Sequence, residues 1–146
     1  MDIDVGSDRR QRRESLFTRM VMAFAHGDLA ALEEGVRSDV ELTLRGSSWL
    51  AGKYRGYVEF GQYAAGAKLV LWAANGQLSY LHAGDEMTVV HDFLVGGGAL
   101  VVEMPLHEVV NFDGDDLVES LLIRPWDQHL FDEAVNAFLV STAIRP

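Results

Sequence analysis

The side chains best able to move a proton stand in the second half of this 146-residue chain, among apolar residues. They are His91, Glu103, His107, Arg124 and Asp127. Histidine can exchange a proton near neutral pH, and a neighbouring carboxylate can orient it. A guanidinium can hold that carboxylate or polarise a substrate oxygen. The set therefore has the composition of a general acid–base site.

Strand pairing decides whether these side chains meet. Two β-rich segments, 87–95 and 99–112, are joined by Gly96-Gly97-Gly98, which predicts a hairpin. If the three glycines form the loop, His91 lies directly opposite Glu103, and opposed side chains share one face of a sheet.

The turn at residues 113–116 extends this register to a last strand over 117–126 and places Glu103 beside Trp126. The predicted face carries His91, Glu103, His107, Arg124 and Trp126, among Val89, Phe93, Val101 and Leu122. Pro105 has no N–H for the ladder, so a bulge there would move part of the set to the other face.

Each member of the set also has a structural explanation. A strand histidine is often a hydrogen-bonded structural residue, and Glu103 and Arg124 could form an ion pair. Asp127 directly precedes the last predicted helix, where an N-cap aspartate explains it. Four aromatic residues are candidates either for substrate binding or for packing: Trp126, Trp49, Tyr54 and Phe93.

The elements that position these residues follow from periodicity. Apolar residues at helical spacing predict a helix to about Ala25 after a loose leader of residues 1–7. Gly27 ends it, and Asp28 can cap a short second helix. Further elements are expected as a strand over 40–44, a loop over 46–56, a helix over 57–67, strands from residue 78 onward, and a closing helix after Asp127. Helices followed by hairpins indicate an α+β fold.

Three segments resemble the SnoaL-like group of the nuclear-transport-factor-2-like superfamily, which includes polyketide cyclases and ketosteroid isomerase. They are Phe24-Ala25-His26-Gly27-Asp28-Leu29 followed by Ser38-Asp39-Val40, then Leu50-Ala51-Gly52-Lys53-Tyr54-Arg55-Gly56, and Asp113-Gly114 with Trp126-Asp127-Gln128 and Asp132. The resemblance implies a cone-shaped, curved antiparallel sheet wrapped over N-terminal helices, enclosing a pocket, and often a homodimer.

The resemblance also bears on the site. Ketosteroid isomerase carries an aspartate base late in its first strand, where this chain reads Leu42-Thr43-Leu44-Arg45, so no carboxylate matches. The cyclase branch uses an acid near the end of the last strand, and Asp127 matches by position. We expect one SnoaL-like domain over residues 15–140, preceded by a leader and the start of the first helix over 1–14 and followed by a C-terminal tail over 141–146.

Composition limits the partners. The net charge is −10, which disfavours binding to nucleic acid, although Arg9, Arg10, Arg12 and Arg13 could form an anion-binding arm or a solvated helical turn. No apolar run approaches the about 20 residues of a membrane span.

There is no cysteine, no His-x-x-x-His metal spacing and no phosphate loop, so neither a metal nor a cofactor is expected. A cytoplasmic location is expected from the acidic N-terminus.

Two functions remain open. The first is a cofactor-independent acid–base enzyme, of cyclase, isomerase or dehydratase type, acting on a hydrophobic oxygenated small molecule. His107 or Asp127 would carry the proton. The second is a non-catalytic domain that binds a ligand or dimerises. A homodimer is expected because Val102, Met104, Leu106, Val110, Leu121 and Ile123 form an apolar face opposite the predicted pocket face.

Overall fold

The structure, a computed structural model, describes the backbone of residues 2–144 and the side chains of residues 6–138. The described helices are α1 (Asp2–His26), α2 (Leu29–Glu34), α3 (Gly56–Val70) and α4 (Gln128–Ile144). The strands are β1 (Val36–Leu44), β2 (Gly52–Arg55), β3 (Leu71–Ala73), β4 (Ser79–Ala83), β5 (Glu86–Gly97), β6 (Leu100–Phe112) and β7 (Val118–Pro125). No described helix has the length and apolar character needed to cross a membrane.

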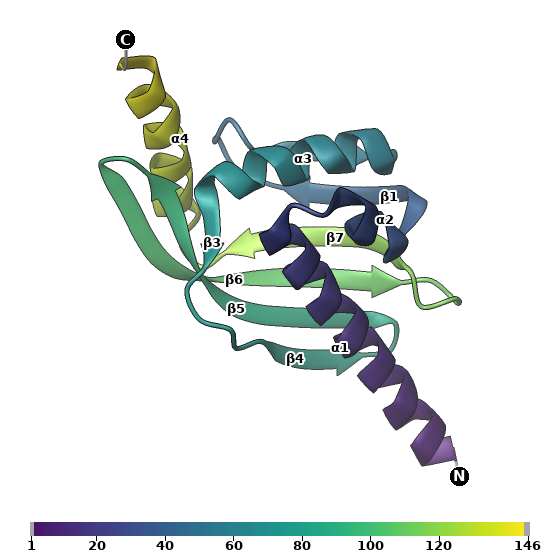
Figure 1. The fold of residues 1–146 in the computed structure, drawn as a ribbon. Coiled ribbons are helices and arrows are strands. Elements are labelled where there is room, and N and C mark those ends of the chain that lie inside the picture. The colour runs from purple at the N-terminus through teal and green to yellow at the C-terminus, as the bar shows by residue number, and fades with distance from the viewer. Residues whose placement is uncertain (1, 145–146) are drawn as a thin grey trace.

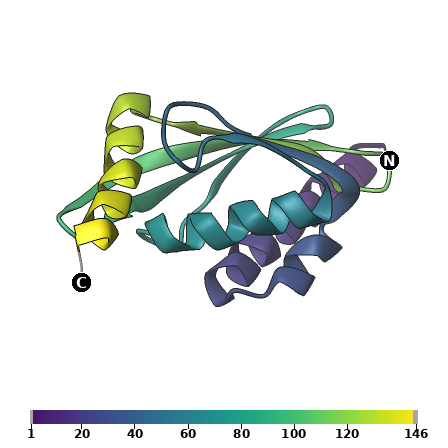
Figure 2. The ribbon, with the colours of Figure 1, turned by 90° about the horizontal axis from the view of Figure 1, so that it is seen from above.

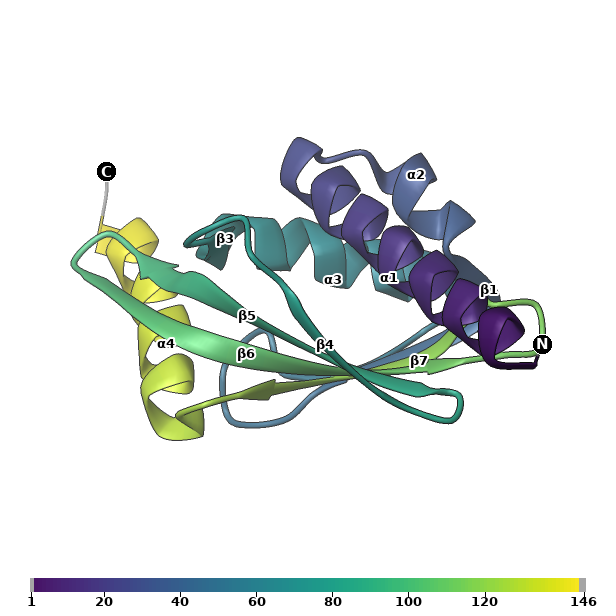
Figure 3. The ribbon, with the colours of Figure 1, turned by 90° about the horizontal axis from the view of Figure 1, so that it is seen from below.

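The strands form one twisted, open sheet that is covered on one side. Its order is β2-β1-β7-β6-β5-β3, with β4 also paired to β5. Helices α1, α2 and α3 lie on one face, and α4 stands at the end of the sheet next to the β5–β6 hairpin (Figures 1, 2 and 3). The predicted α+β, cone-like fold is confirmed. The sheet is mixed rather than wholly antiparallel, because β1 runs parallel to β7.

Most predicted elements are present, with shifted ends. Gly27 follows α1 with φ +71°, and the Asp28 side chain accepts a hydrogen bond from the Ala31 N–H at 3.1 Å. Both are the expected signals of a helix end and an N-cap. Helix α1 begins at Asp2, inside the segment predicted as a leader. The loop predicted over 46–56 contains β2, which pairs with β1 through its backbone.

The β5–β6 hairpin has a register different from the predicted one. Gly97 pairs with Leu100, so the loop contains two residues, Gly98 and Ala99, rather than the three glycines. Gly98 has φ +66°, the left-handed conformation that glycine favours at the first position of such a loop. Gly96 has φ +113° and lies so close to the neighbouring strand that a Cβ would come within 2.3 Å of the Leu100 oxygen. The pairing therefore continues through two of the three glycines.

This register reverses the predicted faces of β6. Met104, Leu106 and Val110 point under the helices and are at most 4 % exposed. They belong to the core together with Leu121 and Ile123. The apolar face that motivated the homodimer is thus the interior of the single chain. Dimerisation stays a prediction, without that motive.

Helix α1 is fastened to two turns of the sheet by its arginines. Arg13 is buried, donates to Asp116 at 2.9 Å and to Asp85 at 3.0 Å, and lies 4.8 Å over the Phe112 ring. Arg9 donates to the same Asp116 oxygen at 2.9 Å. Asp116 also has a positive φ of 61°. Arg9, Arg12 and Arg13 therefore bind carboxylates of their own chain rather than forming a free anion-binding arm, and Arg10 is exposed.

Candidate functional site

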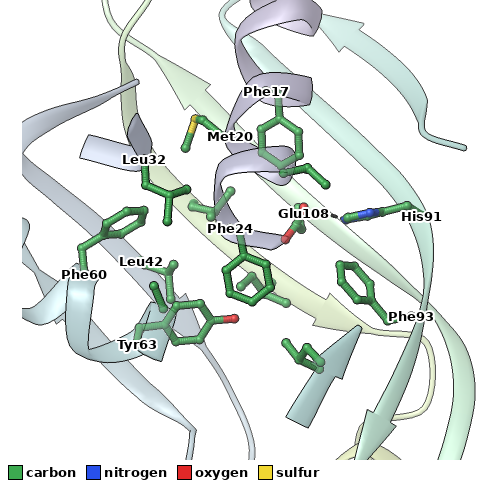
Figure 4. A pocket seen from close by; sticks show the side chains of 15 residues that line it. Phe17, Met20, Phe24, Leu32, Leu42, Phe60, Tyr63, His91, Phe93 and Glu108 are labelled. Carbon is green, nitrogen blue, oxygen red and sulfur yellow. Dashed lines mark hydrogen bonds and ion pairs between the residues drawn. The ribbon is translucent and has the colours of Figure 1, made fainter. Parts of the chain in front are cut away.

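A mostly apolar cavity lies between the sheet and the helices α1, α2 and α3. Its volume is about 70 Å³. The apolar residues around it come from both layers: Phe17, Met20, Val21, Phe24, Leu32, Leu42, Phe60, Ala64, Leu71, Phe93, Leu121 and Ile123. Only three residues bring polar atoms to the wall, His91, Glu108 and Tyr63 (Figure 4). An apolar cavity with a few polar groups is the usual form of a small-molecule site.

The first two polar residues form a buried pair. The Nε2 of His91 lies 2.9 Å from Oε2 of Glu108, as the dashed line in Figure 4 marks. The side chains are 3 % and 12 % exposed. Because β5 and β6 pair with His91 opposite Leu106, Glu108 is the diagonal neighbour of His91 on the same face. A buried carboxylate is costly without partners, so this bond holds Glu108 in place.

Glu108 is only half satisfied by this bond. Its second oxygen, Oε1, accepts no hydrogen bond from a described residue. The single buried polar side-chain atom without a partner in the described part of the chain is Ser48 Oγ. Glu108 Oε1 therefore keeps accessible surface, and since Glu108 lines the cavity, a bound molecule can reach it.

The third polar residue, Tyr63, points its hydroxyl from α3 into the cavity (Figure 4). Burial raises the pKa of Tyr63 well above its usual range, and the nearby charge of Glu108 adds to this increase. The hydroxyl therefore keeps its proton at neutral pH. It makes no hydrogen bond to a described residue, so it is available as a donor to a ligand oxygen.

These groups supply the parts of proton-transfer chemistry. Glu108 offers an unpaired carboxylate oxygen, His91 orients it, and Tyr63 offers a neutral donor in the same cavity. A carboxylate in an apolar, water-poor site can remove a proton from carbon, and a fixed donor can stabilise the negative charge that forms on oxygen.

The predicted cross-strand pair His91–Glu103 is wrong. Glu103 pairs with Leu94, not with His91, because the hairpin loop is one residue shorter and the strand extends further than predicted. His91 pairs with Leu106, which lies three residues beyond its predicted partner on β6. A shift by an odd number of residues places the predicted partner on the opposite face of the sheet. His91 points inward with Phe93, whereas Glu103 is exposed on the outer face. Pro105 remains in register opposite Asp92 and does not cause the change.

Three other predicted site residues lie away from the cavity. His107 pairs with Arg124, so these two share a face as predicted, but it is the outer face of the sheet. Both line a broad depression there together with polar residues of β1 and β2. Trp126 lies beside Pro105 and not beside Glu103. The backbone N–H of Trp126 donates to the Pro105 carbonyl at 3.0 Å. Its side chain is 73 % exposed.

Of the three other predicted substrate-binding aromatics, two pack within the chain and one lines the cavity. Trp49 donates from its ring nitrogen to the Val135 carbonyl at 2.7 Å and fastens the β1–β2 loop to α4. Tyr54 donates to the Leu50 carbonyl at 2.6 Å, and its ring packs on Tyr63 at 5.3 Å between centroids. Phe93 stands edge-on to the His91 ring, 4.2 Å between centroids, inside the cavity.

Asp127 caps the last helix and does not line the cavity. Its Oδ1 accepts the Leu130 N–H at 3.0 Å, and the residue is exposed. We expect Asp127→Ala to lower the free energy of unfolding by about 1 kcal/mol and Asp127→Asn to change it little, since asparagine caps equally well. Urea unfolding of the two variants measures this. A loss of ligand turnover in a normally stable Asp127→Asn protein would restore the catalytic role predicted from sequence.

Glu108 and Tyr63 were not singled out as site residues from the sequence. The signal for Glu108 was present in the alternation of β6, where it interrupts the apolar row Met104, Leu106, Val110 and Phe112. A lone carboxylate in the buried row of a strand needs a partner, and that requirement points to His91. Tyr63 lies in the helix predicted over 57–67, where its spacing is typical of a core residue and gives no sign of a site. Within the described residues, no group of three or more His, Asp or Glu side chains converges as a metal site would need.

Comparison with known proteins supports the fold. No protein-family model matches the chain, and no curated protein is significantly similar to it. Among solved structures, an NTF2-like protein from Burkholderia xenovorans LB400 is similar, with 19 % identity, a TM-score of 0.74, and coverage of 86 % of this chain and 97 % of that chain. The expected likeness to the nuclear-transport-factor-2-like superfamily is thus confirmed at the level of fold.

Two further similar structures bear on the range of functions this fold has in other proteins. TerC, co-crystallized with polyporic acid, has 15 % identity and a TM-score of 0.72, covering 84 % of this chain and 97 % of that one. A candidate polyketide cyclase from Xanthomonas campestris pv. campestris has 13 % identity and a TM-score of 0.69, covering 87 % of this chain and 98 % of that one. At these identities the likeness establishes the fold alone.

Proposed function

We propose that this protein is a cofactor-independent acid–base enzyme that acts on a hydrophobic, oxygenated small molecule inside the cavity. The observation that carries the proposal is the half-satisfied carboxylate of Glu108, buried at the wall of an apolar cavity and oriented by His91. The proton carrier is thus Glu108 rather than His107 or Asp127, which lie outside the cavity.

The proposed step is the removal of a proton from a carbon next to a carbonyl group. Glu108 Oε1 takes the proton, the electron pair of the C–H bond forms a carbon–carbon double bond, and the carbonyl electrons move to oxygen. The Tyr63 hydroxyl donates a hydrogen bond to that oxygen as it becomes negative. When the substrate also carries a carbon–carbon double bond between the β and γ carbons, the enolate is a dienolate. Return of the same proton from Glu108 to the γ carbon then moves that double bond next to the carbonyl group and completes an isomerisation, so neither an oxidant nor a co-substrate is consumed.

Two observations support this chemistry. Burial and the charge of Glu108 raise the pKa of Tyr63, which keeps the donor protonated next to a base. The bond from His91 engages one of the two equivalent oxygens of the Glu108 carboxylate and so restricts rotation of that group, while the other oxygen stays available. Preorganised groups of this kind need little rearrangement during the reaction. The neighbours described as candidate polyketide cyclases add support by fold analogy only.

A non-catalytic binding domain is the second candidate. The observation in its favour is that His91 and Glu108 are each other's partner, because a buried pair of this kind can also serve stability alone. The two candidates differ in one measurable property. A binder holds a carbonyl compound without exchanging its protons, whereas the enzyme exchanges them.

Deuterium exchange at the α-carbons of cyclohexanone tests the proposal without knowledge of the natural substrate. We expect the folded protein in D₂O to accelerate the loss of the α-proton NMR signal by at least about 100-fold over equal concentrations of free acetate and imidazole, in line with general base catalysis. Exchange no faster than that of the free buffers, with cyclohexanone demonstrably bound, would favour the binding domain.

A further inference from the structure

The geometry points to an uncharged molecule with a single ring and one hydrogen-bond-accepting oxygen as the ligand of the cavity, and to the exclusion of anions. The inference deepens the proposed function and rests on it only for the orientation of the ligand. The charge, the size and the polar pattern of the cavity each restrict the ligand independently.

Charge gives the first restriction. No lysine or arginine is among the residues that line the cavity, while Glu108 is. A carboxylate or phosphate on the ligand would therefore meet a carboxylate in a low-dielectric site with no lysine or arginine to offset it, and the imidazole of His91 is already engaged with Glu108. The arginines of α1 do not supply that cation. Arg9, Arg12 and Arg13 are bound to Asp116 at the far end of the helix. Arg10 and Arg19 are exposed and do not line the cavity, and Arg19 lines a separate surface depression.

An organic cation is the competing class. Aromatic rings near a carboxylate can hold an ammonium group, and Phe17, Phe24 and Phe93 stand around this carboxylate (Figure 4). Two features favour the neutral ligand. His91 already engages one oxygen of Glu108. An ammonium group could use only the lone pairs of the Tyr63 hydroxyl and would leave its hydrogen without an acceptor, whereas a ligand oxygen accepts that hydrogen.

Size gives the second restriction. A cavity of about 150 Å³ accommodates benzene in a well-studied protein. The present cavity has about 70 Å³, so a single ring requires modest rotations of side chains such as Met20 and Phe24, both on α1. Enclosing a fused two-ring molecule in this volume would require α1 itself to move, and that helix is fastened by Arg13 to Asp85 and Asp116.

The polar pattern gives the orientation. Tyr63 and Glu108 reach the cavity from opposite layers, one from α3 and the other from β6. A ring lying between them can present its oxygen to the Tyr63 hydroxyl and an adjacent C–H bond to Glu108 Oε1. A molecule with several polar groups would leave the others against apolar walls, which is unfavourable.

Four probes of matched framework separate the alternatives: cyclohexanone, cyclohexanecarboxylate, cyclohexylammonium and 2-decalone. Their dissociation constants are measured from shifts of methyl signals in two-dimensional NMR spectra of the protein. We expect cyclohexanone to bind at least about tenfold more tightly than both ions, and 2-decalone to bind more weakly than cyclohexanone. Glu108→Gln should bring the affinity for the carboxylate closer to that for the ketone, while Glu103→Gln on the outer face should not.

Four results would overturn the inference: equal or tighter binding of the carboxylate, tighter binding of the ammonium ion, equal binding of 2-decalone, or the absence of binding by any of the probes. Failure of the ligand class and failure of the proposed function give different patterns. Cyclohexanone bound selectively but without α-proton exchange removes the acid–base function and leaves the ligand class. Exchange together with a preference for the carboxylate removes the ligand class and leaves the function.

Discussion

Replacing Glu108 with glutamine is expected to abolish α-proton exchange while the protein remains folded. Glutamine keeps the shape of the side chain, and its amide oxygen can still accept the bond from His91 at the position of Oε2. It has no basic oxygen to take a proton from carbon. We therefore expect the exchange of cyclohexanone to fall by at least about 100-fold, the usual contribution of a general base.

Glu103→Gln is the matched control for this prediction. Glu103 lies on the same strand, five residues earlier, but on the outer face of the sheet and away from the cavity. Its replacement should leave exchange unchanged within about twofold, since it removes the same charge without touching the site. Equal losses in both variants would mean that net charge, rather than the position of Glu108, controls the reaction. Full activity of Glu108→Gln would assign the base to another residue.

The helices and strands of this fold could be predicted from the sequence more accurately than the pairing of the strands. Helix ends at Gly27 and Asp28 and most of the strands could be predicted because glycine, capping residues and alternation act locally. The short strands β2 and β3 could not be predicted well, since each depends on backbone pairing to a longer neighbour. The parallel contact between β1 and β7 joins segments about eighty residues apart, and no local signal announces it.

The candidate site depended on a single structural feature that the sequence left ambiguous. Three consecutive glycines allow a loop of two residues as well as one of three, because glycine adopts positive φ and also tolerates a close backbone neighbour. The choice reverses which row of β6 faces inward. The apolar row Met104, Leu106 and Val110 favoured the two-residue loop, because that loop turns this row toward the helices of the same chain, where it is buried. Because this row was interpreted as a dimer interface, Glu108, which lies on the same face, was not recognised as a residue of the cavity.

Arg13→Met is expected to lower the free energy of unfolding by about 2–4 kcal/mol at neutral pH, because it removes the buried partner of two carboxylates. Arg13 is 3 % exposed and bridges Asp116 and Asp85, in the turns that precede β7 and β5. Methionine can keep the contact with Phe112, so the loss comes mainly from the charge. Urea unfolding at pH 7 measures it. Arg10→Met, an exposed position in the same helix, is the control and should change stability little.

The pH dependence of this loss of stability tests whether it comes from the bond between Arg13 and Asp116. Burial alone would raise the pKa of Asp116, but hydrogen bonds and charges from Arg9 and Arg13 outweigh it and lower the pKa below its ordinary value of 3.8. A lowered carboxyl pKa stabilises the fold at every pH above the ordinary value and loses that contribution as the pH falls through the lowered one. The difference between wild type and Arg13→Met should therefore be full from pH 7 down to about 5 and shrink below about 4. A difference that stays constant down to pH 3 would show that the loss does not come from the bond between Arg13 and Asp116. In that case α1 would be fastened over the cavity mainly by the bonds from Glu14 to His82 and from Thr18 to Tyr80.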